Sequence, residues 1–559
     1  MRILFLSHYF PPEGNAPASR TYENCKRWVR EGHEVTVLTC VPNCPDGVPY
    51  EGYRNRIWQK ETFDGIKVVR VWTYLAANKG RLRRTANYLS YMVSAVFSTL
   101  FVTRPDILIA TSPQVFCGLA GIIAGRLRRV PVVLEIRDLW PESIVAVGAM
   151  RKGRGIILLE WLEQRMYAAA AHIVTVGYGY RNCLISRGVE PAKISVIANG
   201  ADFALYSRRN VDPSLESRFG MDGKFVCLYC GTIGMACGLE IVIRAARILK
   251  EKGRENISFL MVGDGAACQN LEREAKREGL RNIVFAGRQP KSLIPDLLAM
   301  SDVCLVHLRK AATFKTVLPS KIFEAAAMAK PILLGVEGCA SVLVREAEAG
   351  ICFEPENAVQ LAAEIEKLAD DPTLAGRLGL SGREYVRRYY DREMLARRYL
   401  DLILRVQRSS GQSRVAGART GSPCAYCGTC QKWTTSRATL AATFLAMLKP
   451  PSVPGSNEIK RCYKCMEVCF HGLAIPDLLQ ALRFQKAGEH ARASSIYEEI
   501  PEQLRADRCG NCGLCEHSCP QGVFIRKEMS RAAVLLHALE LGDTACCVSS
   551  ENGQLSRKG

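Results

Sequence analysis

Short apolar runs alternate with longer amphipathic stretches from Met1 to about Tyr399. The runs are rich in β-branched residues and the stretches between them repeat with the period of a helix, which predicts parallel sheets covered on both faces. The predicted strands of a first unit are RILFLS, EVTVLT, DILIAT, VPVVLEI, HIVTVG and ISVIAN. A second unit begins at FVCLYCG and continues through ISFLMVG, NIVFAG, DVCLVHL and PILLGV. We therefore expect an α/β fold with two Rossmann-like halves.

One segment of the first half combines basic and apolar residues. Lys79, Arg81, Arg83 and Arg84 precede YLSYMVSAVFSTLFV, which has the composition of an apolar helix. A basic group beside an apolar helical face is typical of helices that lie on anionic membrane surfaces. The pattern is equally typical of a buried helix, so the sequence leaves both interpretations open.

The pattern changes after YLDLILRVQ. The run RSSGQSRVAGARTGSP has no apolar period and no acidic residue, which predicts a flexible basic linker over residues 409–423. The segments with helical periodicity beyond it are TTSRATLAATFLAML, IPDLLQALRFQKAG, HARASSIYEEIPEQL and SRAAVLLHALEL. We expect two domains over 1–200 and 201–408, a helical cysteine-rich domain over 424–545 and a disordered tail over 546–559.

Length and charge narrow the function classes. A chain of 559 residues is expected to form about three or four domains. The formal charge of +20 indicates an anionic partner: a nucleic acid, a phosphate-bearing substrate or an anionic membrane surface. The motifs of nucleic-acid-binding domains are missing, so we do not expect nucleic acid. No stretch reaches the ~18 apolar residues of a membrane span, and the first residues do not form a signal peptide, so we expect a cytoplasmic protein.

Twelve of the 24 cysteines lie in the last quarter of the chain. In RCGNCGLCEHSCPQG, Cys509, Cys512, Cys515 and Cys519 are separated by two, two and three residues, and Pro520 follows. This is the run that binds 4Fe-4S clusters in bacterial ferredoxins. Zinc sites favour separate CxxC pairs, so the spacing favours iron and sulfide over zinc.

An internal repeat supports this interpretation. CYKCMEVCFHGLAIP aligns with CGLCEHSCPQGVFIR at an offset of fifty residues and supplies Cys462, Cys465 and Cys469. Ile459 stands where the complete run has Cys509. Further upstream, PCAYCGTC contains three more candidate ligands, Cys424, Cys427 and Cys430. One of these could complete the first cluster, the first site could hold a three-cysteine cluster, or the upstream motif could be a remnant. We expect one 4Fe-4S cluster, and the repeat allows a second.

Two glycine-containing loops follow predicted strands. Gly14 lies in PPEGNAPASR, and Gly231 and Gly234 lie in YCGTIGMACGLE. Such loops let backbone amides approach a phosphate at the carboxyl edge of a sheet, although neither matches GxGxxG. In LPSKIFEAAAMAKPILLG, a helix capped by its serine would bring Lys321 and Glu324 near one face. Lysine can neutralise a diphosphate and glutamate can accept from ribose hydroxyls, and a capped surface helix is the alternative.

The motifs PSKIFEAAAMAKPILLG, YCGTIGMACGLE, EIRDLWPES and NYLSYMVSAVFSTL, in their relative positions, resemble those of glycosyltransferase family 4. The resemblance is greatest to the branch that serves O-antigen, capsule and colanic-acid assembly, and it extends from Met1 to about Arg408. It implies a GT-B fold, in which two Rossmann-like domains face each other across a cleft. It also implies transfer of a sugar from a nucleotide diphosphate with retention of configuration and without a metal.

The resemblance implies a role for each matching residue. Lys321 would pair with the donor diphosphate and Glu324 would bind the ribose. The other residues on the donor side, which make room for the phosphates or line the junction with the acceptor, would be Gly231, Thr232, Gly234, Gly14 and Asn15. Asp138 and Glu142 are candidates for the carboxylate that takes the acceptor proton, with helix capping as the alternative for Asp138. Arg137, the third catalytic candidate, stands where many members have a histidine.

The region from about Cys462 to Arg531 resembles the helical two-cluster ferredoxin modules of some aldo/keto reductases, which pass single electrons.

Taken together, the two resemblances imply a transferase that moves a sugar, such as an N-acetylated amino sugar, to a polyprenyl-diphosphate-linked acceptor. It would work at the inner face of the cell membrane, with an iron-sulfur module of regulatory or electron-transfer role and a redox partner elsewhere.

Two alternatives stay open, and three departures from the family pattern support the first of them. Thr316 replaces the first of two glutamates eight residues apart, and Cys237 and Cys339 replace polar residues of the branch. The first alternative is an electron-transfer protein on a degenerate transferase scaffold. The second is a zinc-stabilised docking module.

Overall fold

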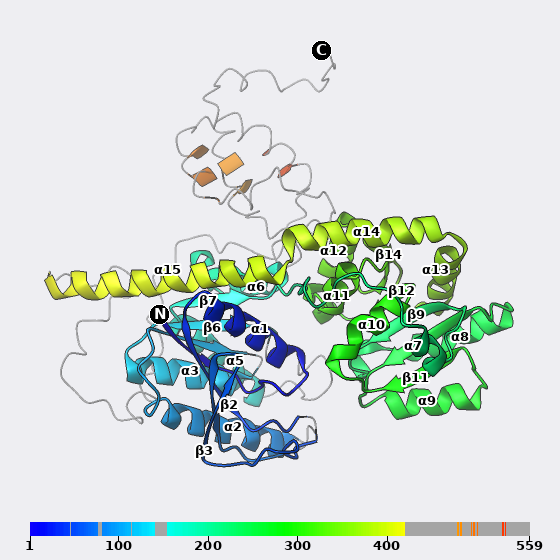
Figure 1. The fold of residues 1–559 in the computed structure, drawn as a ribbon. Coiled ribbons are helices and arrows are strands. Elements are labelled where there is room, and N and C mark those ends of the chain that lie inside the picture. Colours follow the sequence, from blue (N-terminus) through cyan, green and yellow to red (C-terminus); the bar gives the residue numbers. More distant parts are fainter. Residues whose placement is uncertain are drawn as a thin grey trace, which may run out of the picture.

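The computed structural model describes residues 1–44, 46–76, 81–112, 114–139 and 154–419, the last range with side chains to residue 410. It also describes a few helical residues between 478 and 532. These residues confirm the predicted α/β fold of two Rossmann-like domains (Figure 1).

An eight-stranded sheet forms the first domain, in the order β3-β4-β2-β1-β5-β6-β7-β8. Its strands are β1 (Arg2–Leu6), β2 (Glu34–Cys40), β3 (Trp58–Phe63), β4 (Ile66–Val71), β5 (Ile107–Thr111), β6 (Val132–Ile136), β7 (His172–Thr175) and β8 (Ile194–Val196). All neighbours are parallel except β3 and β4, which form an antiparallel hairpin. The parallel strands are mostly apolar on both sides because helices cover both faces of the sheet, whereas the edge strand β3 is polar and half-exposed.

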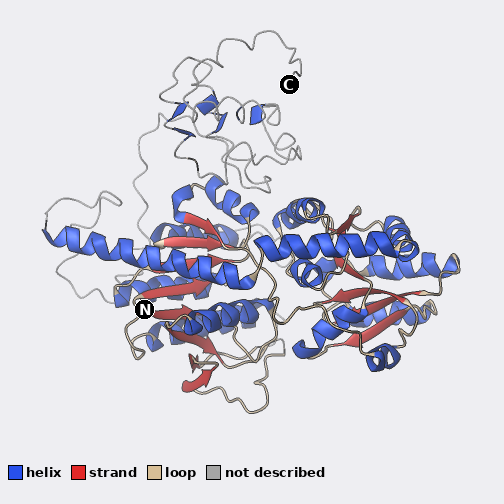
Figure 2. Ribbon diagram, turned by 45° about the horizontal axis from the view of Figure 1, so that its top comes forward, coloured by secondary structure: helices blue, strands red, loops and turns tan. Residues whose placement is uncertain are grey.

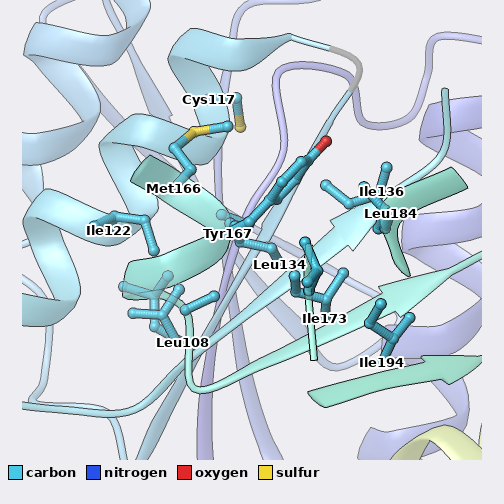
Figure 3. Close-up of a cluster of buried hydrophobic side chains, with 14 of the residues drawn as sticks. Leu108, Cys117, Ile122, Leu134, Ile136, Met166, Tyr167, Ile173, Leu184 and Ile194 are labelled. Atoms are coloured by element: carbon cyan, nitrogen blue, oxygen red, sulfur yellow. The ribbon is translucent and has the colours of Figure 1, made fainter. Parts of the chain in front are cut away.

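Helices cover the first sheet in two layers (Figure 2). The helices of this domain are α1 (Ala16–Arg30), α2 (Arg81–Ser98), α3 (Val115–Arg128), α5 (Arg154–Ala169) and α6 (Tyr178–Ser186). The layer of α2, α3, α5 and α6 packs on one core, and α1 packs on the other. Figure 3 shows the first of these cores, where the Tyr167 ring lies among Leu134, Ile136 and Ile173.

A six-stranded parallel sheet forms the second domain, in the order β11-β10-β9-β12-β13-β14. Its strands are β9 (Phe225–Cys230), β10 (Ile257–Val262), β11 (Ile283–Gly287), β12 (Val303–His307), β13 (Ile332–Gly335) and β14 (Gly350–Cys352). Its helices are α7 (Pro213–Phe219), α8 (Glu240–Glu251), α9 (Cys268–Arg277), α10 (Ile294–Met300), α11 (Lys321–Ala327), α12 (Cys339–Glu346), α13 (Ala358–Asp370) and α14 (Pro372–Tyr389). Two buried clusters, one on each face of the sheet, form its core.

The last long helix, α15 (Arg392–Arg419), leaves the second domain and lies along the first (Figure 1). Its apolar residues at helical spacing, including Leu395, Tyr399 and Ile403, complete the core that α1 covers. Tyr399 meets Trp28 edge to face at 5.2 Å, and the Trp28 indole donates to the Ala396 carbonyl. The chain therefore links the two domains twice, after β8 and again before α15.

This helix differs from the predicted domain boundaries in two ways. Residues 392–408, predicted to belong to the second domain, pack on the first. The predicted linker over 409–423 begins within the helix, which extends to Arg419. A packed helix supplies the nucleus that an isolated Gly/Ser/Arg segment lacks, and extending it costs only about 1 kcal/mol at each glycine.

Candidate active site

The loop after β9 brings backbone to the carboxyl edge of the second sheet. Gly231 has a φ of 140°, and a Cβ atom on Gly263 would lie 1.9 Å from the Gly231 carbonyl oxygen. The chain segments that leave β9 and β10 are therefore in direct contact at this point. Only glycine fits there, because a side chain would need both the space and a backbone conformation that L residues avoid.

Hydrogen bonds hold the rest of this glycine turn in place. The Tyr229 hydroxyl donates to the Thr232 carbonyl at 2.7 Å, and the Cys237 thiol donates to the same oxygen at 3.3 Å. Arg309 donates from its backbone to the Ala236 carbonyl. Cys237, one of the departures from the family pattern, thus supports the turn from within. Gly234 precedes the 3₁₀ turn at Met235–Cys237.

Lys321 begins helix α11 and reaches under the glycine turn. Its ammonium lies 3.8 Å from the centre of the Tyr229 ring, and a Cβ atom on Gly231 would be 3.1 Å from Nζ. Burial lowers the pKa of Lys321, and the acidic groups of Cys237, Cys230 and Glu324 oppose that shift. Within the described part of the chain, no carboxylate pairs with this ammonium at 4 Å or less. The site thus holds a buried cation with capacity for an anionic ligand.

Glu324 lies one turn further along α11. Burial raises its pKa, and the positive charges of Lys291 and Lys321, together with a hydrogen bond from Tyr206, oppose that shift. The structure therefore brings together the four donor-side residues predicted in this domain with Glu324, namely Gly231, Thr232, Gly234 and Lys321. Lys291 was absent from the sequence-based set.

On the first domain, Asn15 caps helix α1. Its side-chain oxygen accepts from the Ala18 amide at 2.9 Å, and the open space around the Gly14 Cα would admit a side chain. Arg137 donates to the Ala16 and Pro17 carbonyls at 3.0 and 3.1 Å. Its charge is buried beside Glu135, and burial lowers the pKa of Arg137 to about 10. The described contacts of Arg137 are therefore those of a group that holds the start of α1.

Of the two acidic candidates in the EIRDLWPES motif, Asp138 lies within the described residues. The Asp138 carboxylate accepts from the Leu139 amide at 2.9 Å, in the manner of a turn or cap. The pKa of the buried Tyr180 hydroxyl is raised by burial and, to a smaller extent, by the charge of Asp138. Glu142 lies outside the described residues.

Among the described residues, contacts at Lys291 and at Thr316 join the second domain to the first. The Lys291 ammonium lies 3.1 Å from Ser19 Oγ and 3.2 Å from Glu23 Oε1, both on α1. Elsewhere, a Cβ atom on Gly179 would lie 2.8 Å from Thr316 Cβ, so α6 and the loop before α11 touch closely. Thr316 thus fills an interdomain contact where the family pattern has a glutamate.

A small hollow opens beside the first strand of the first domain. The residues that line it are His8, Tyr9, Asn43, Cys44, Ala76, Arg84, Asn87 and Tyr88. His8 Nδ1 is buried without a hydrogen-bond partner in the described structure. Arg84 donates to the Tyr88 hydroxyl at 3.1 Å. This hollow combines a cation and aromatic hydroxyls, which the sequence motifs did not indicate.

All ten candidate cysteine ligands lie outside the described residues. The predicted helices around them are described in part, and the residues buried there are Leu478, Ala481, Leu482, Ala493, Tyr497, Ile500, Met529 and Ala532. The segments before and after the run from Cys509 to Cys519 therefore contribute apolar side chains to buried surroundings.

Three family models match the chain. Residues 15–200 match the glycosyl transferase 4-like domain, and residues 216–385 match the glycosyl transferases group 1. Residues 460–524 match the 4Fe-4S dicluster domain, which contains both the complete cysteine run and its repeat. The three models follow the order and approximate boundaries of the motifs.

Known proteins agree with these matches. The putative colanic acid biosynthesis glycosyl transferase WcaI of Escherichia coli K12 is 28% identical over 416 residues, which are 72% of this chain and 100% of the relative. Anabaena Alr3699/HepE, solved with UDP and glucose, has a TM-score of 0.54 at 19% identity over 72% of this chain and 99% of that one. Sucrose-phosphate synthase of Thermosynechococcus elongatus has a TM-score of 0.57 at 17% identity, over 73% and 99%. Both structures share the GT-B fold. The chain is therefore a glycosyltransferase of the family 4 type with a 4Fe-4S dicluster domain after its two transferase domains.

Proposed function

We propose that this enzyme transfers a sugar, with retention, from a nucleotide diphosphate to a lipid-linked intermediate of a cell-surface polysaccharide. The observation that carries the donor half of this proposal is Lys321. Its buried ammonium, without a paired carboxylate among the described residues, lies beside the open glycine turn. The UDP in the HepE structure and the polysaccharide role of WcaI support the same donor and pathway class.

The chemistry follows from charge. As the bond to the sugar breaks, the nucleotide diphosphate gains negative charge while the sugar becomes cationic. Lys321 and the amides of the glycine turn would stabilise the departing diphosphate, and Glu324 would accept hydrogen bonds from the ribose. A fixed cation in a buried site needs little reorganisation and can act in place of a metal. Asp138 and Glu142 remain our candidates for the group that takes the acceptor proton.

The acceptor would enter through the first domain. Arg84, Tyr9 and Tyr88 line the hollow beside β1 with groups that can donate to a phosphate, and α2 leads away from it. A polyprenyl diphosphate offers both the phosphate and an apolar chain. We therefore assign the hollow to the anionic head of a lipid-linked acceptor.

The outer face of α2 suits a membrane surface. The apolar residues that this helix and the following turn expose are Leu82, Leu89, Val93, Phe97, Leu100 and Phe101. Arg83 and Arg104 are exposed near the two ends of this stripe. None of the helices in the described part of the chain combines the length and apolar character that a membrane crossing requires. We assign the stripe to peripheral attachment on the anionic inner leaflet.

The dicluster domain would have a regulatory or electron-transfer role. Its donor set fits the cofactor, because four thiolates at ferredoxin spacing are the ligands that a 4Fe-4S cluster requires. When bound, such a cluster accepts and releases single electrons. Cys462, Cys465 and Cys469 would serve a second cluster, with a further ligand from Cys424, Cys427 or Cys430.

The test uses the full chain purified without oxygen. Labelled UDP- and GDP-sugars are offered with a polyprenyl-diphosphate-linked acceptor in vesicles, and product is measured by mass spectrometry. Transfer that is lost in Lys321→Ala supports the proposal. A protein that transfers nothing from any donor, and whose cellular role survives Lys321→Ala but not Cys512→Ala, would be the electron-transfer alternative. Iron and sulfide analysis, with absorbance near ~400 nm, separates a cluster from zinc.

A further inference from the structure

Lys291 lies in the loop between β11 and α10 of the second domain. Its side chain crosses to α1 of the first domain, where Ser19 and Glu23 accept from its ammonium at 3.1 and 3.2 Å. Figure 1 shows α1 and α10 facing each other across the two domains. The partners are 272 and 268 residues apart along the chain. This is thus a tertiary contact between domains.

The carboxylate of Glu23 is buried and surrounded by cations. Its side chain is only 7% exposed, and Arg27 and Arg392 also face it. Arg27 belongs to α1 itself, and Arg392 lies where the chain returns to the first domain in α15. Lys291 therefore reaches Glu23 from the segment between β11 and α10 of the second domain.

The same ammonium also acts on the donor site. The charges of Glu324 and Asp202 favour the protonated form of Lys291 against burial, which lowers its pKa. In turn, the positive charge of Lys291 favours the ionised form of Glu324 more strongly than the charge of Lys321 does. Lys291 thus contacts a carboxylate of the first domain directly, and its charge also favours the ionised form of the carboxylate that we assign to the donor ribose.

We propose that Lys291 is a positioning residue that holds the two domains together and links this contact to occupancy of the donor site. The inference rests on the proposed donor role of Glu324. Ribose hydroxyls that donate to Glu324 would satisfy its carboxylate and leave the ammonium to Glu23. Donor binding then strengthens the interdomain contact, and by reciprocity the contact strengthens donor binding. The apolar contact between Gly179 and Thr316 carries no charge and cannot respond in this way.

The first experiment needs no substrate. Small-angle scattering of the full chain is compared for wild type, Lys291→Gln and the control Lys252→Gln, whose lysine pairs with Glu366 inside the second domain. We expect a larger radius of gyration for Lys291→Gln alone, and recovery in Lys291→Arg. An unchanged radius in Lys291→Gln overturns the proposed contact, whatever the enzyme transfers.

The second experiment measures the link. Binding of UDP or GDP, whichever the wild type binds, is measured for Lys291→Gln, Ser19→Ala, Glu23→Gln and the double variant of Lys291 and Glu23. We expect about fivefold weaker binding in Lys291→Gln, and a double variant no weaker than its weaker single variant within about twofold. Multiplicative losses would overturn the coupling. Ser19→Ala, a small change, tests the same contact if Glu23→Gln fails to fold. If neither nucleotide binds the wild type, the donor role of Glu324 fails and the coupling fails with it, while the scattering result still stands for the contact.

Discussion

Lys321 is the residue on which the donor site depends most. We predict that Lys321→Met lowers kcat by about 10² or more, because the variant loses the cation that meets the departing diphosphate. Thermal unfolding should not occur at a lower temperature, since burial disfavours the lysine charge. Initial rates and unfolding midpoints measure the two effects. Lys310→Met is the matched control, because Lys310 is exposed and pairs with Glu354. A rate within threefold of wild type would contradict the assigned role.

Gly263 tests the backbone contact beside the glycine turn. We predict that Gly263→Ala lowers the free energy of unfolding by about 2 kcal/mol, because its Cβ would overlap the Gly231 carbonyl at a φ of 132°. Gly376→Ala is the control: that helical glycine has open space around it, and alanine should be neutral or stabilise by about 0.5 kcal/mol. Urea unfolding of both variants gives the comparison. Equal midpoints would contradict the close approach of β9 and β10.

Residue chemistry was predictable where the signal is local. Lys321 and Glu324 lie one turn apart on one helix, so their sequence spacing already indicated a shared face. Lys291 was not predictable, since its partners lie more than 250 residues away and no local pattern marks an interdomain contact. Arg137 was predicted as catalytic from its motif, but its hydrogen bonds to the start of α1 depend on the folded loop. That geometry has no counterpart in the sequence.

At the scale of elements, the loop that follows strand β1 (Arg2–Leu6) contains a buried histidine, His8, that makes stability depend on pH. The His8 ring packs edge to face on Tyr88 and Tyr91, and burial lowers the pKa of His8 to about 3. In the unfolded chain the imidazole takes up a proton below about pH 6.5, whereas the folded chain does not. Stability contributed by neutral His8 is therefore present above pH 6.5 and is lost as pH falls toward about 3.

We predict that His8→Phe loses less stability than wild type on acidification. The difference should approach 1.4 kcal/mol for each pH unit well below 6.5, because one fewer proton is bound on unfolding. Urea unfolding at pH 7.5, 6.0 and 5.0 measures the slope. Parallel slopes for the two proteins would show that His8 is protonated in the folded state.

The helices and strands show which sequence patterns are sufficient to predict an element. The eleven predicted strands correspond to strands of the two sheets, because continuous β-branched runs mark buried parallel strands. The hairpin of β3 and β4 was missed, although Asp64 and Gly65, both with positive φ, form the turn that an Asp-Gly pair favours. Its strand β3 is half-exposed and polar, so hydrophobicity alone could not reveal it. Helix α15 was misassigned because its partner core belongs to the distant first domain.

At the scale of the whole molecule, the two chain crossings and the charged network around Glu23 set how the domains meet. Arg27 pairs with Asp202 after the first crossing and with Glu393 after the second. Lys291 joins the same network through Glu23, which also faces Arg27. The network therefore holds α1 to the second domain at Asp202 as well as at Lys291.

The orientation of the molecule on a membrane gives the last prediction. Val93 and Phe97 are 62% and 60% exposed in the middle of the α2 stripe, one helical turn apart. We predict that Val93→Ser with Phe97→Ser weakens sedimentation with phosphatidylglycerol vesicles about tenfold or more, since two apolar side chains no longer enter the interface. Transfer to a water-soluble, short-chain acceptor should stay unchanged, because the stripe is outside the donor site.

The control for this surface is Val359→Ser, an equally exposed apolar residue on α13 of the second domain, at 69%. It should bind vesicles as wild type does. High salt should weaken binding of the wild type, because Arg83 and Arg104 contribute through the surface potential of the anionic lipid. If the α2 variant and the α13 variant sediment alike, the stripe is an ordinary exposed helix face, and the lipid-linked acceptor must reach the hollow beside His8 and Arg84 by another side of the domain.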